Sequence, residues 1–84
     1  MITPNDELNE ILDHAEAAQD RYGDFASVHE ALGVALEEWM ELISAVHSSA
    51  IESVRDEAID LAAVLLRLAH QCRSSQTMKE RSVK

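Results

Sequence analysis

Four acidic residues form two pairs whose types and spacing could do chemistry. Glu38 and Glu41 are three positions apart, and so are Glu57 and Asp60. In a helix, side chains three positions apart lie next to each other on one face. Paired carboxylates suit hard divalent cations, and Mg²⁺ is the usual choice where phosphate oxygens complete the coordination. The two pairs therefore indicate a site for a hard divalent cation, Mg²⁺, Mn²⁺ or Ca²⁺.

The two pairs can meet if a short turn joins their helices into a hairpin. With a turn near residues 48–50, Glu41 lies about eight positions before it and Glu57 about eight after it. On antiparallel neighbours the pairs then fall at similar heights. Four carboxylates at close range repel one another, and a bound cation removes that repulsion. The simpler alternative is that each pair belongs to a solvated helix face.

A di-iron carboxylate centre is the competing metal site. It needs a Glu-x-x-His motif on two helices of a bundle. None of the four histidines has a glutamate three positions before it. We therefore interpret them as surface or local hydrogen-bonding residues: His14, His29, His47 and His70.

The carboxylates need helices to position them, and the sequence predicts an all-α domain. Alanine is frequent, alternating strand patterns are absent, and there is a single proline. We expect one domain with helices at about residues 4–22, 28–47 and 50–73, and residues 74–84 as a tail or a short helix. The second and third helices form the antiparallel hairpin, and the first packs on it.

Local signals set the ends of these helices. Pro4 suits the first turn of a helix that begins at Thr3, and Gly23 suits its C-terminal cap. Segments 27–30 (SVHE) and 49–52 (SAIE) both have the pattern of a capping box, which begins a helix. Each hairpin helix therefore has a predicted starting point.

Large apolar residues recur every three or four positions and predict the buried faces of the hairpin. The predicted core positions of the second helix are Val28, Leu32, Leu36, Trp39, Ile43 and Val46, and those of the third are Val54, Leu61, Leu65 and Leu68. The acidic pairs lie at the margins of these stripes.

The chain is short and acidic. Its 84 residues carry 16 Asp and Glu against 7 Lys and Arg, a net charge of −9. A helical chain of this size has a small core and usually gains stability from a partner subunit or a bound ion. Three helices also leave one face of the hairpin uncovered, so we expect oligomerisation, as a homodimer or homotetramer, to complete a helical bundle.

The charge is uneven along the chain. Residues 1–60 hold 15 acids and 2 bases, whereas residues 61–84 hold 1 acid and 5 bases. The overall acidity argues against DNA or RNA and against an anionic membrane surface, because both are bound through Lys and Arg. The longest apolar run, residues 61–66, is far shorter than the ~20 residues that span a bilayer. We expect neither a nucleic-acid polymer nor a membrane as a partner.

The single cysteine, Cys72, cannot form an internal disulfide, which fits a reducing compartment. The first residues show no basic segment followed by an apolar one, the pattern of a signal peptide. We therefore expect the protein to be cytoplasmic.

The order and spacing of the acids resemble a known signature. Residues 37–41 read E-E-x-x-E, and fifteen residues later residues 57–60 read E-x-x-D. This pattern, with its hairpin and the Y-G-D-F lead-in of residues 22–25, resembles the MazG-like, all-α nucleoside triphosphate pyrophosphohydrolases. The resemblance implies hydrolysis of an NTP or dNTP to a monophosphate and pyrophosphate, dependent on Mg²⁺, with Mn²⁺ as a substitute.

The resemblance also implies how the site is built. It makes Glu38, Glu41, Glu57 and Asp60 the metal ligands, and family members are dimers or tetramers whose pocket a neighbouring subunit partly completes. A metal held by carboxylates neutralises charge on phosphate oxygens and activates water. Glu38 or Glu41 is the expected acceptor of the water's proton.

Six further residues are candidates for supporting roles. They are Glu37 and Asp56 beside the metal ligands, Arg67 and Lys79 for phosphate, and Tyr22 and Phe25 for stacking on a base. Each has a structural alternative, which is a solvated surface for the charged residues and anchoring in the core for the two aromatic residues.

Two other functions fit the same pattern. A non-catalytic helical interaction module would use the hairpin only to dimerise, although such a module has no need of four convergent acids. A sensor would bind a nucleotide through the metal without hydrolysing it. Metal titration separates the first from an enzyme, and analysis of the products separates the second.

Overall fold

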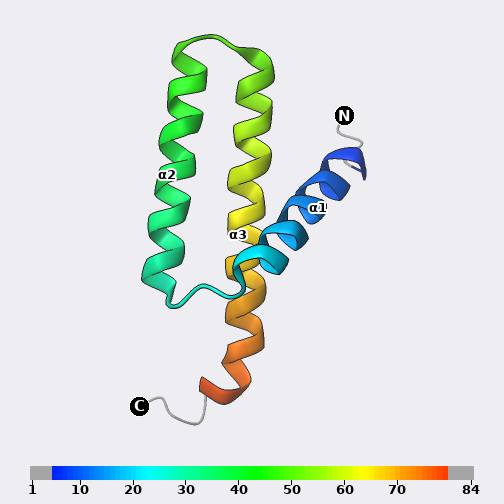
Figure 1. Ribbon diagram of the computed structural model, residues 1–84, viewed down its shortest axis with the longest axis vertical. Coiled ribbons are helices and arrows are strands. Elements are labelled where there is room, and N and C mark those ends of the chain that lie inside the picture. The colour runs from blue at the N-terminus through cyan, green and yellow to red at the C-terminus, as the bar shows by residue number, and fades with distance from the viewer. Residues whose placement is uncertain (1–4, 80–84) are drawn as a thin grey trace.

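The computed structural model describes residues 5–79, with side chains for residues 5–74. This part of the chain forms three helices, α1 (Asn5–Tyr22), α2 (Val28–His47) and α3 (Ile51–Lys79), and contains no strand (Figure 1). The predicted all-α fold is therefore confirmed. None of these three helices is long and apolar enough to cross a membrane.

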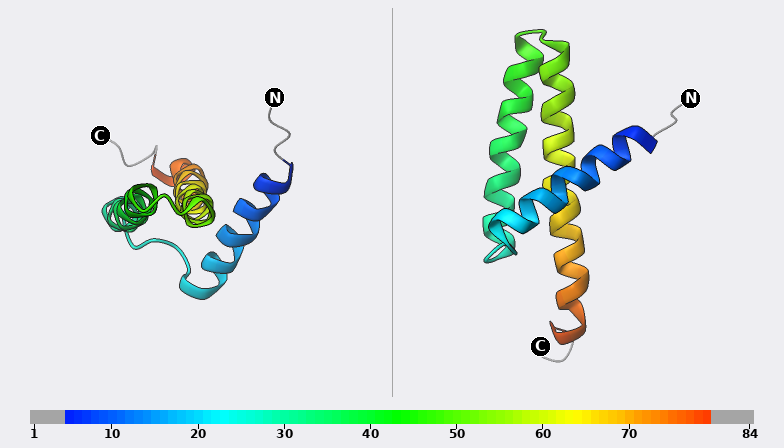
Figure 2. Two further views of the ribbon diagram at one scale, coloured as in Figure 1. Left: turned by 90° about the horizontal axis from the view of Figure 1, so that it is seen from above. Right: turned by 45° about the vertical axis from the view of Figure 1, so that its right-hand side comes forward.

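α3 is the central helix of the fold. It runs antiparallel to α2 in a hairpin, and α1 crosses it obliquely (Figures 1 and 2). Among the described residues, α1 contacts α3 and does not contact α2. The C-terminal part of α3 extends past the beginning of α2. Every contact between helices in this structure therefore involves α3.

The hairpin packs through small residues. On α2 the buried positions are Ala31 and Ala45, and Ala31 packs with Val64 of α3 in a cluster that also contains Phe25. Val34, Ala35 and Leu68 border this cluster. The face of α2 that meets α3 is thus its alanine face, and Glu38 is half-buried on the same side.

The predicted core face of α2 is wrong. Its six large apolar residues are exposed, with Trp39 showing 48% of its surface: Val28, Leu32, Leu36, Trp39, Ile43 and Val46. We call these six residues the outer stripe. Alanine allows two helices to approach more closely than leucine or tryptophan does, and both faces repeat with the same spacing. Periodicity therefore cannot tell the two faces apart. On α3, the predicted core residue Leu65 is exposed as well.

The connection from α1 to α2 follows the sequence signals. Gly23 ends α1 with a positive φ of 73°, and its N–H donates to the carbonyl of Gln19 at 2.8 Å. Ser27 caps α2 by accepting from the N–H of Glu30 at 3.0 Å. The Glu30 carboxylate reaches back to the N–H of Ala26 at 2.6 Å, which closes a variant of the predicted capping box.

The connection from α2 to α3 differs from the prediction. Segment 49–52 does not form a capping box, because Ser49 adopts a left-handed φ of 59° and ends α2 instead. Its N–H donates to Val46 O at 3.0 Å, and the N–H of Ala50 donates to Ala45 O at 3.3 Å. This pair of hydrogen bonds is a Schellman motif. Serine can serve as the N-cap of a helix or as a residue that closes the preceding helix. Here the tight turn between α2 and α3 requires Ser49 to close α2.

The C-terminal end of α3 also differs from the prediction. α3 continues to Lys79, whereas the sequence predicts an end near residue 73. The serines and threonine of segment 74–77 lower helix propensity without breaking the helix. Thr3 and Pro4, the expected start of the first helix, lie outside the described residues, as does the side chain of Lys79.

Polar contacts fasten α1 and the following loop to α3. Arg55 of α3 forms a two-pronged ion pair with Glu10, with a second carboxylate, Glu7, 3.9 Å away. The ion pair lowers the pKa of Glu10. In the loop, the Gln71 side chain accepts from the Phe25 N–H and donates to the Phe25 carbonyl, both at 2.9 Å. These contacts set the position of α1 over the hairpin.

Candidate metal centre

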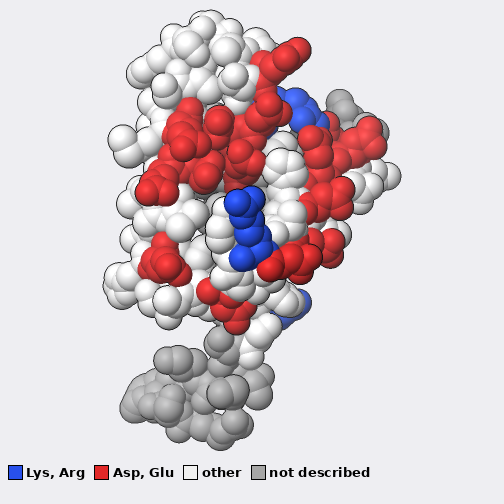
Figure 3. Space-filling view, viewed as in Figure 1, with Lys and Arg blue, Asp and Glu red and all other residues white. Residues whose placement is uncertain are grey.

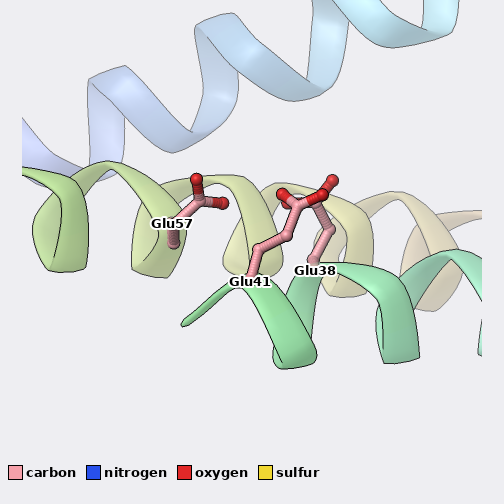
Figure 4. Close-up of side chains that lie close together, drawn as sticks. All are labelled: Glu38, Glu41 and Glu57. Atoms are coloured by element: carbon pink, nitrogen blue, oxygen red, sulfur yellow. The ribbon is translucent and has the colours of Figure 1, made fainter. Parts of the chain in front are cut away.

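Three glutamates meet across the hairpin. Glu38 and Glu41 extend from α2 and Glu57 from α3, and one carboxylate oxygen of each lies within 4.8 Å of the others. Figure 4 shows the three carboxyl groups on the same side of the hairpin, the side that α1 crosses. We call these residues the carboxylate cluster. The turn at residues 48–50 sets the register that brings residues of α2 and α3 to this height.

Two oxygens of the carboxylate cluster are buried without a hydrogen bond. They are Oε1 of Glu38 and Oε1 of Glu57, and neither has a donor among the described residues. A buried acceptor without a donor costs free energy, more so when it is charged. A cation supplies what these oxygens lack. The all-oxygen donor set fits Mg²⁺ or Mn²⁺.

The electrostatics of the cluster favour a bound proton or cation. Burial, with the charges of Glu41, Asp60 and Glu57, raises the pKa of Glu38 to about 7. Burial and the neighbouring Glu41 also raise the pKa of Glu57. Figure 3 shows the wider setting, in which Asp and Glu side chains gather over much of one face of the molecule. Positive charge is therefore attracted to this part of the surface.

Asp60, the fourth predicted ligand, lies beside the carboxylate cluster but is not one of the three converging groups. Its Oδ1 is 2.9 Å from Nδ1 of His14 on α1. Its charge nevertheless contributes to the raised pKa of Glu38. Asp60 is therefore near enough for its charge to raise the pKa of Glu38, while its own carboxylate is hydrogen-bonded to His14 of α1.

A groove of about 940 Å³ opens beside the cluster, between α1 and the hairpin. Glu38 and Asp60 line it, and so do the two arginines Arg21 and Arg67. Its volume is in the range of sites that hold nucleotide-sized ligands. The groove thus has acidic and cationic groups around one cavity.

Arg67 is held firmly at the edge of this groove. Its guanidinium donates to Gly23 O at 3.0 Å and to Gln19 Oε1 at 3.3 Å. It also lies over the Phe25 ring, 4.3 Å from the ring centre. These contacts orient the side chain, and a guanidinium has five N–H donors, so it keeps capacity for an anion.

The other supporting residues lie in different surroundings. Phe25 is 7% exposed and anchors the core, whereas Tyr22 is 69% exposed on the groove wall. Glu37 is exposed and also lines the groove. Asp56 is exposed and lies 4.0 Å from Arg55, away from the carboxylate cluster. The structure thus places Tyr22, Phe25 and Glu37 on the lining of the groove, with Phe25 also packed in the core, and pairs Asp56 with Arg55.

His14 was not among the predicted site residues, although it contacts Asp60 in the structure. It lies 46 residues from Asp60 in the chain, and no spacing rule relates two helices joined through a third. His14 lies four residues after Glu10 on the same face of α1. Both side chains contact α3, Glu10 through Arg55 and His14 through Asp60. Long-range contacts of this kind have no local signal in the sequence.

Comparison of the chain with protein-family models, with curated protein sequences and with solved structures finds no match.

Proposed function

We propose that this protein is a Mg²⁺-dependent nucleoside triphosphate pyrophosphohydrolase of the MazG-like kind. It would convert an NTP or dNTP and water into a monophosphate and pyrophosphate. The supporting observation is the convergence of Glu38, Glu41 and Glu57 within 4.8 Å, with two buried oxygens that lack donors, beside a groove of nucleotide size. Such oxygens are stabilised by a hard cation.

In this proposal the four acids bind the metal, and one of them also accepts a proton. Glu38, Glu41 and Glu57 hold the metal, and Asp60 joins them from the groove side. When bound, Mg²⁺ would neutralise charge on the phosphate oxygens and activate water. Glu38 or Glu41 accepts the proton as water adds to the α-phosphorus and the bond to pyrophosphate breaks.

The groove supplies the remaining contacts. Arg67 is oriented by Gly23 and Gln19 to bind a phosphate oxygen, and the exposed ring of Tyr22 is available for stacking on a base. Lys79, whose side chain lies outside the described residues, is retained as a second phosphate-binding candidate.

We further propose that the protein acts in the cytoplasm as a homodimer or homotetramer. The supporting observation is the outer stripe of α2, six large apolar residues exposed side by side on one helix. Contiguous exposed apolar surface of this kind marks interaction sites. A second hairpin packed there would complete a helical bundle around each α2.

Pyrophosphate release tests the enzymatic proposal. Incubation of the purified chain with Mg²⁺ and each common NTP and dNTP should yield pyrophosphate and the monophosphate from at least one of them. Glu41→Gln and Asp60→Asn should lower turnover at least 100-fold without loss of helical circular dichroism. Glu52→Gln, an exposed acid in the first turn of α3, is the matched control and should keep wild-type turnover. Release of no pyrophosphate from any substrate contradicts the proposal.

The outer stripe also favours the second candidate, a non-catalytic helical interaction module. Such a protein would oligomerise through α2 and bind Mn²⁺ no more tightly than an unrelated acidic helical protein. A nucleotide sensor would bind metal and nucleotide together and leave the triphosphate intact. Metal titration and product analysis on one preparation therefore separate the three functions.

A further inference from the structure

His14 occupies a distinctive place among the contacts of α1. Three polar links tie α1 to α3 along its length: Glu10 with Arg55, His14 with Asp60, and Gln19 with Arg67. The first and last lie on either side of the carboxylate cluster along α3. Only the middle link ends on a residue whose charge acts on the cluster, Asp60.

The chemistry of this link fixes its direction. An ionised aspartate can only accept hydrogen bonds, so Nδ1 of His14 carries the hydrogen and donates to Oδ1 of Asp60. One carboxylate oxygen is then engaged, and the other is left for a metal ion. Imidazole and carboxylate are 46% and 39% exposed, so without this contact the aspartate would be free to change rotamer in water.

We propose that His14 is a positioning residue for Asp60, which it holds beside the carboxylate cluster so that the second carboxylate oxygen can reach a metal ion bound there. The proposal rests on the proposed metal binding by the cluster. Ligating carboxylates are commonly hydrogen-bonded by a neighbouring group, and loss of that group typically weakens metal binding 10- to 100-fold. Because His14 belongs to α1 and the other ligands to the hairpin, the contact also couples the docking of α1 to metal binding.

Titration with Mn²⁺ tests this role without any measurement of activity. The signal of free Mn²⁺ in electron paramagnetic resonance disappears on binding, which gives an affinity for the full chain and for each variant. His14→Ala should bind Mn²⁺ about tenfold more weakly. His14→Asn should restore most of the affinity, since the asparagine amide can donate from a position close to that of Nδ1.

Two further variants separate positioning from simple support of the fold. Gln19→Ala removes a different contact between α1 and α3, the hydrogen bond from the Arg67 guanidinium, and should leave the Mn²⁺ affinity within about twofold of wild type. In an Asp60→Asn background, His14→Ala should cause little further loss, because the two residues act as one unit.

The outcomes are distinct. If the wild type binds no Mn²⁺, the proposed metal site itself is wrong. If the wild type binds and His14→Ala binds equally well, or if Gln19→Ala loses as much affinity as His14→Ala, the positioning role is wrong. Full additivity of His14→Ala and Asp60→Asn would also overturn it.

Discussion

Glu38 is an ionisable side chain in a partly buried position, which disfavours its charged form. It occupies the side of α2 that packs against α3, where the neighbouring positions are alanines. A carboxylate at such a position is partly removed from water, and three other acids surround it. The free energy of this arrangement is unfavourable for the ionised, metal-free form. The site therefore lowers the stability of the empty hairpin and gives a cation a large effect on it.

This conflict predicts how stability depends on pH. The pKa of Glu38 is about 7 in the folded chain against an ordinary value of 4.5, so between these values the folded state binds more protons. Stability should therefore fall as the pH rises from 5 to 8, with Glu38 contributing roughly 1–2 kcal/mol. Urea unfolding at the two pH values measures the change.

Glu38→Gln is the control for that measurement, because it keeps the shape and removes the titration. The variant should lose most of the decrease between pH 5 and pH 8. Adding Mg²⁺ at pH 8 should raise the stability of the wild type, by about 2.7 kcal/mol at a concentration 100 times the dissociation constant. An equal pH dependence in both proteins would show that Glu38 ionises normally.

At the scale of the elements, the hairpin depends on a turn of three residues. Ser49 takes a left-handed conformation there, which costs an ordinary L-residue roughly 1–2 kcal/mol. The Schellman hydrogen bonds hold it in place and thereby fix the register of α2 against α3. The height at which the carboxylates meet is set by this turn.

Ser49→Gly should therefore stabilise the protein. Glycine adopts a φ of 59° without strain, and part of this gain is offset by its greater freedom in the unfolded chain. We expect a net gain of about 0.5–1 kcal/mol, which raises the melting temperature of a domain of this size by several degrees. Thermal unfolding followed by circular dichroism measures it.

Ser48→Gly provides the matched comparison. Ser48 has a right-handed φ of −87°, and its hydroxyl donates to Ala45 O at 3.0 Å. This change removes a hydrogen bond without relieving strain, so it should lower the melting temperature. A decrease for both variants would mean that the left-handed conformation of Ser49 carries no strain.

Sequence patterns predicted the elements better than the contacts between them. Local signals such as Gly23 and the capping box at Ser27 gave the ends of α1 and the start of α2, and the turn position gave the approach of Glu38 to Glu57. The packed face of α2 was wrong because hydrophobicity favours the larger side chains, whereas two close helices favour alanine. His14 was missed because its partner lies on a helix distant in sequence.

At the scale of the whole molecule, the outer stripe exposes six large apolar residues of α2 to water when the chain is alone. Leu36, Trp39 and Ile43 lie near its middle, and all three are exposed. Burial of these side chains against a second copy would remove apolar surface from water and so favour a dimer. Stable interfaces typically bury about 800 Å² on each partner.

Leu36→Glu should therefore disrupt the oligomer. Light scattering after size exclusion should give the wild type at least twice the chain mass of 9.3 kDa and the variant close to that mass. Leu8→Glu is the matched control, an equally exposed leucine on α1 that lies outside the stripe, and it should leave the mass unchanged. A monomeric wild type at micromolar concentration would contradict the proposed assembly.

Among the described residues, α1 contacts α3 and not α2, and this bears on the order in which the helices fold. α2 and α3 are neighbours in sequence and can form their contacts outward from the turn, with little chain entropy lost at each step. The links of α1 join residues 45 to 48 positions apart, so they form efficiently only after α3 is in place. We expect the hairpin to be largely structured in the folding transition state and α1 to dock late. Substitutions in α1 would then act mainly on the unfolding rate.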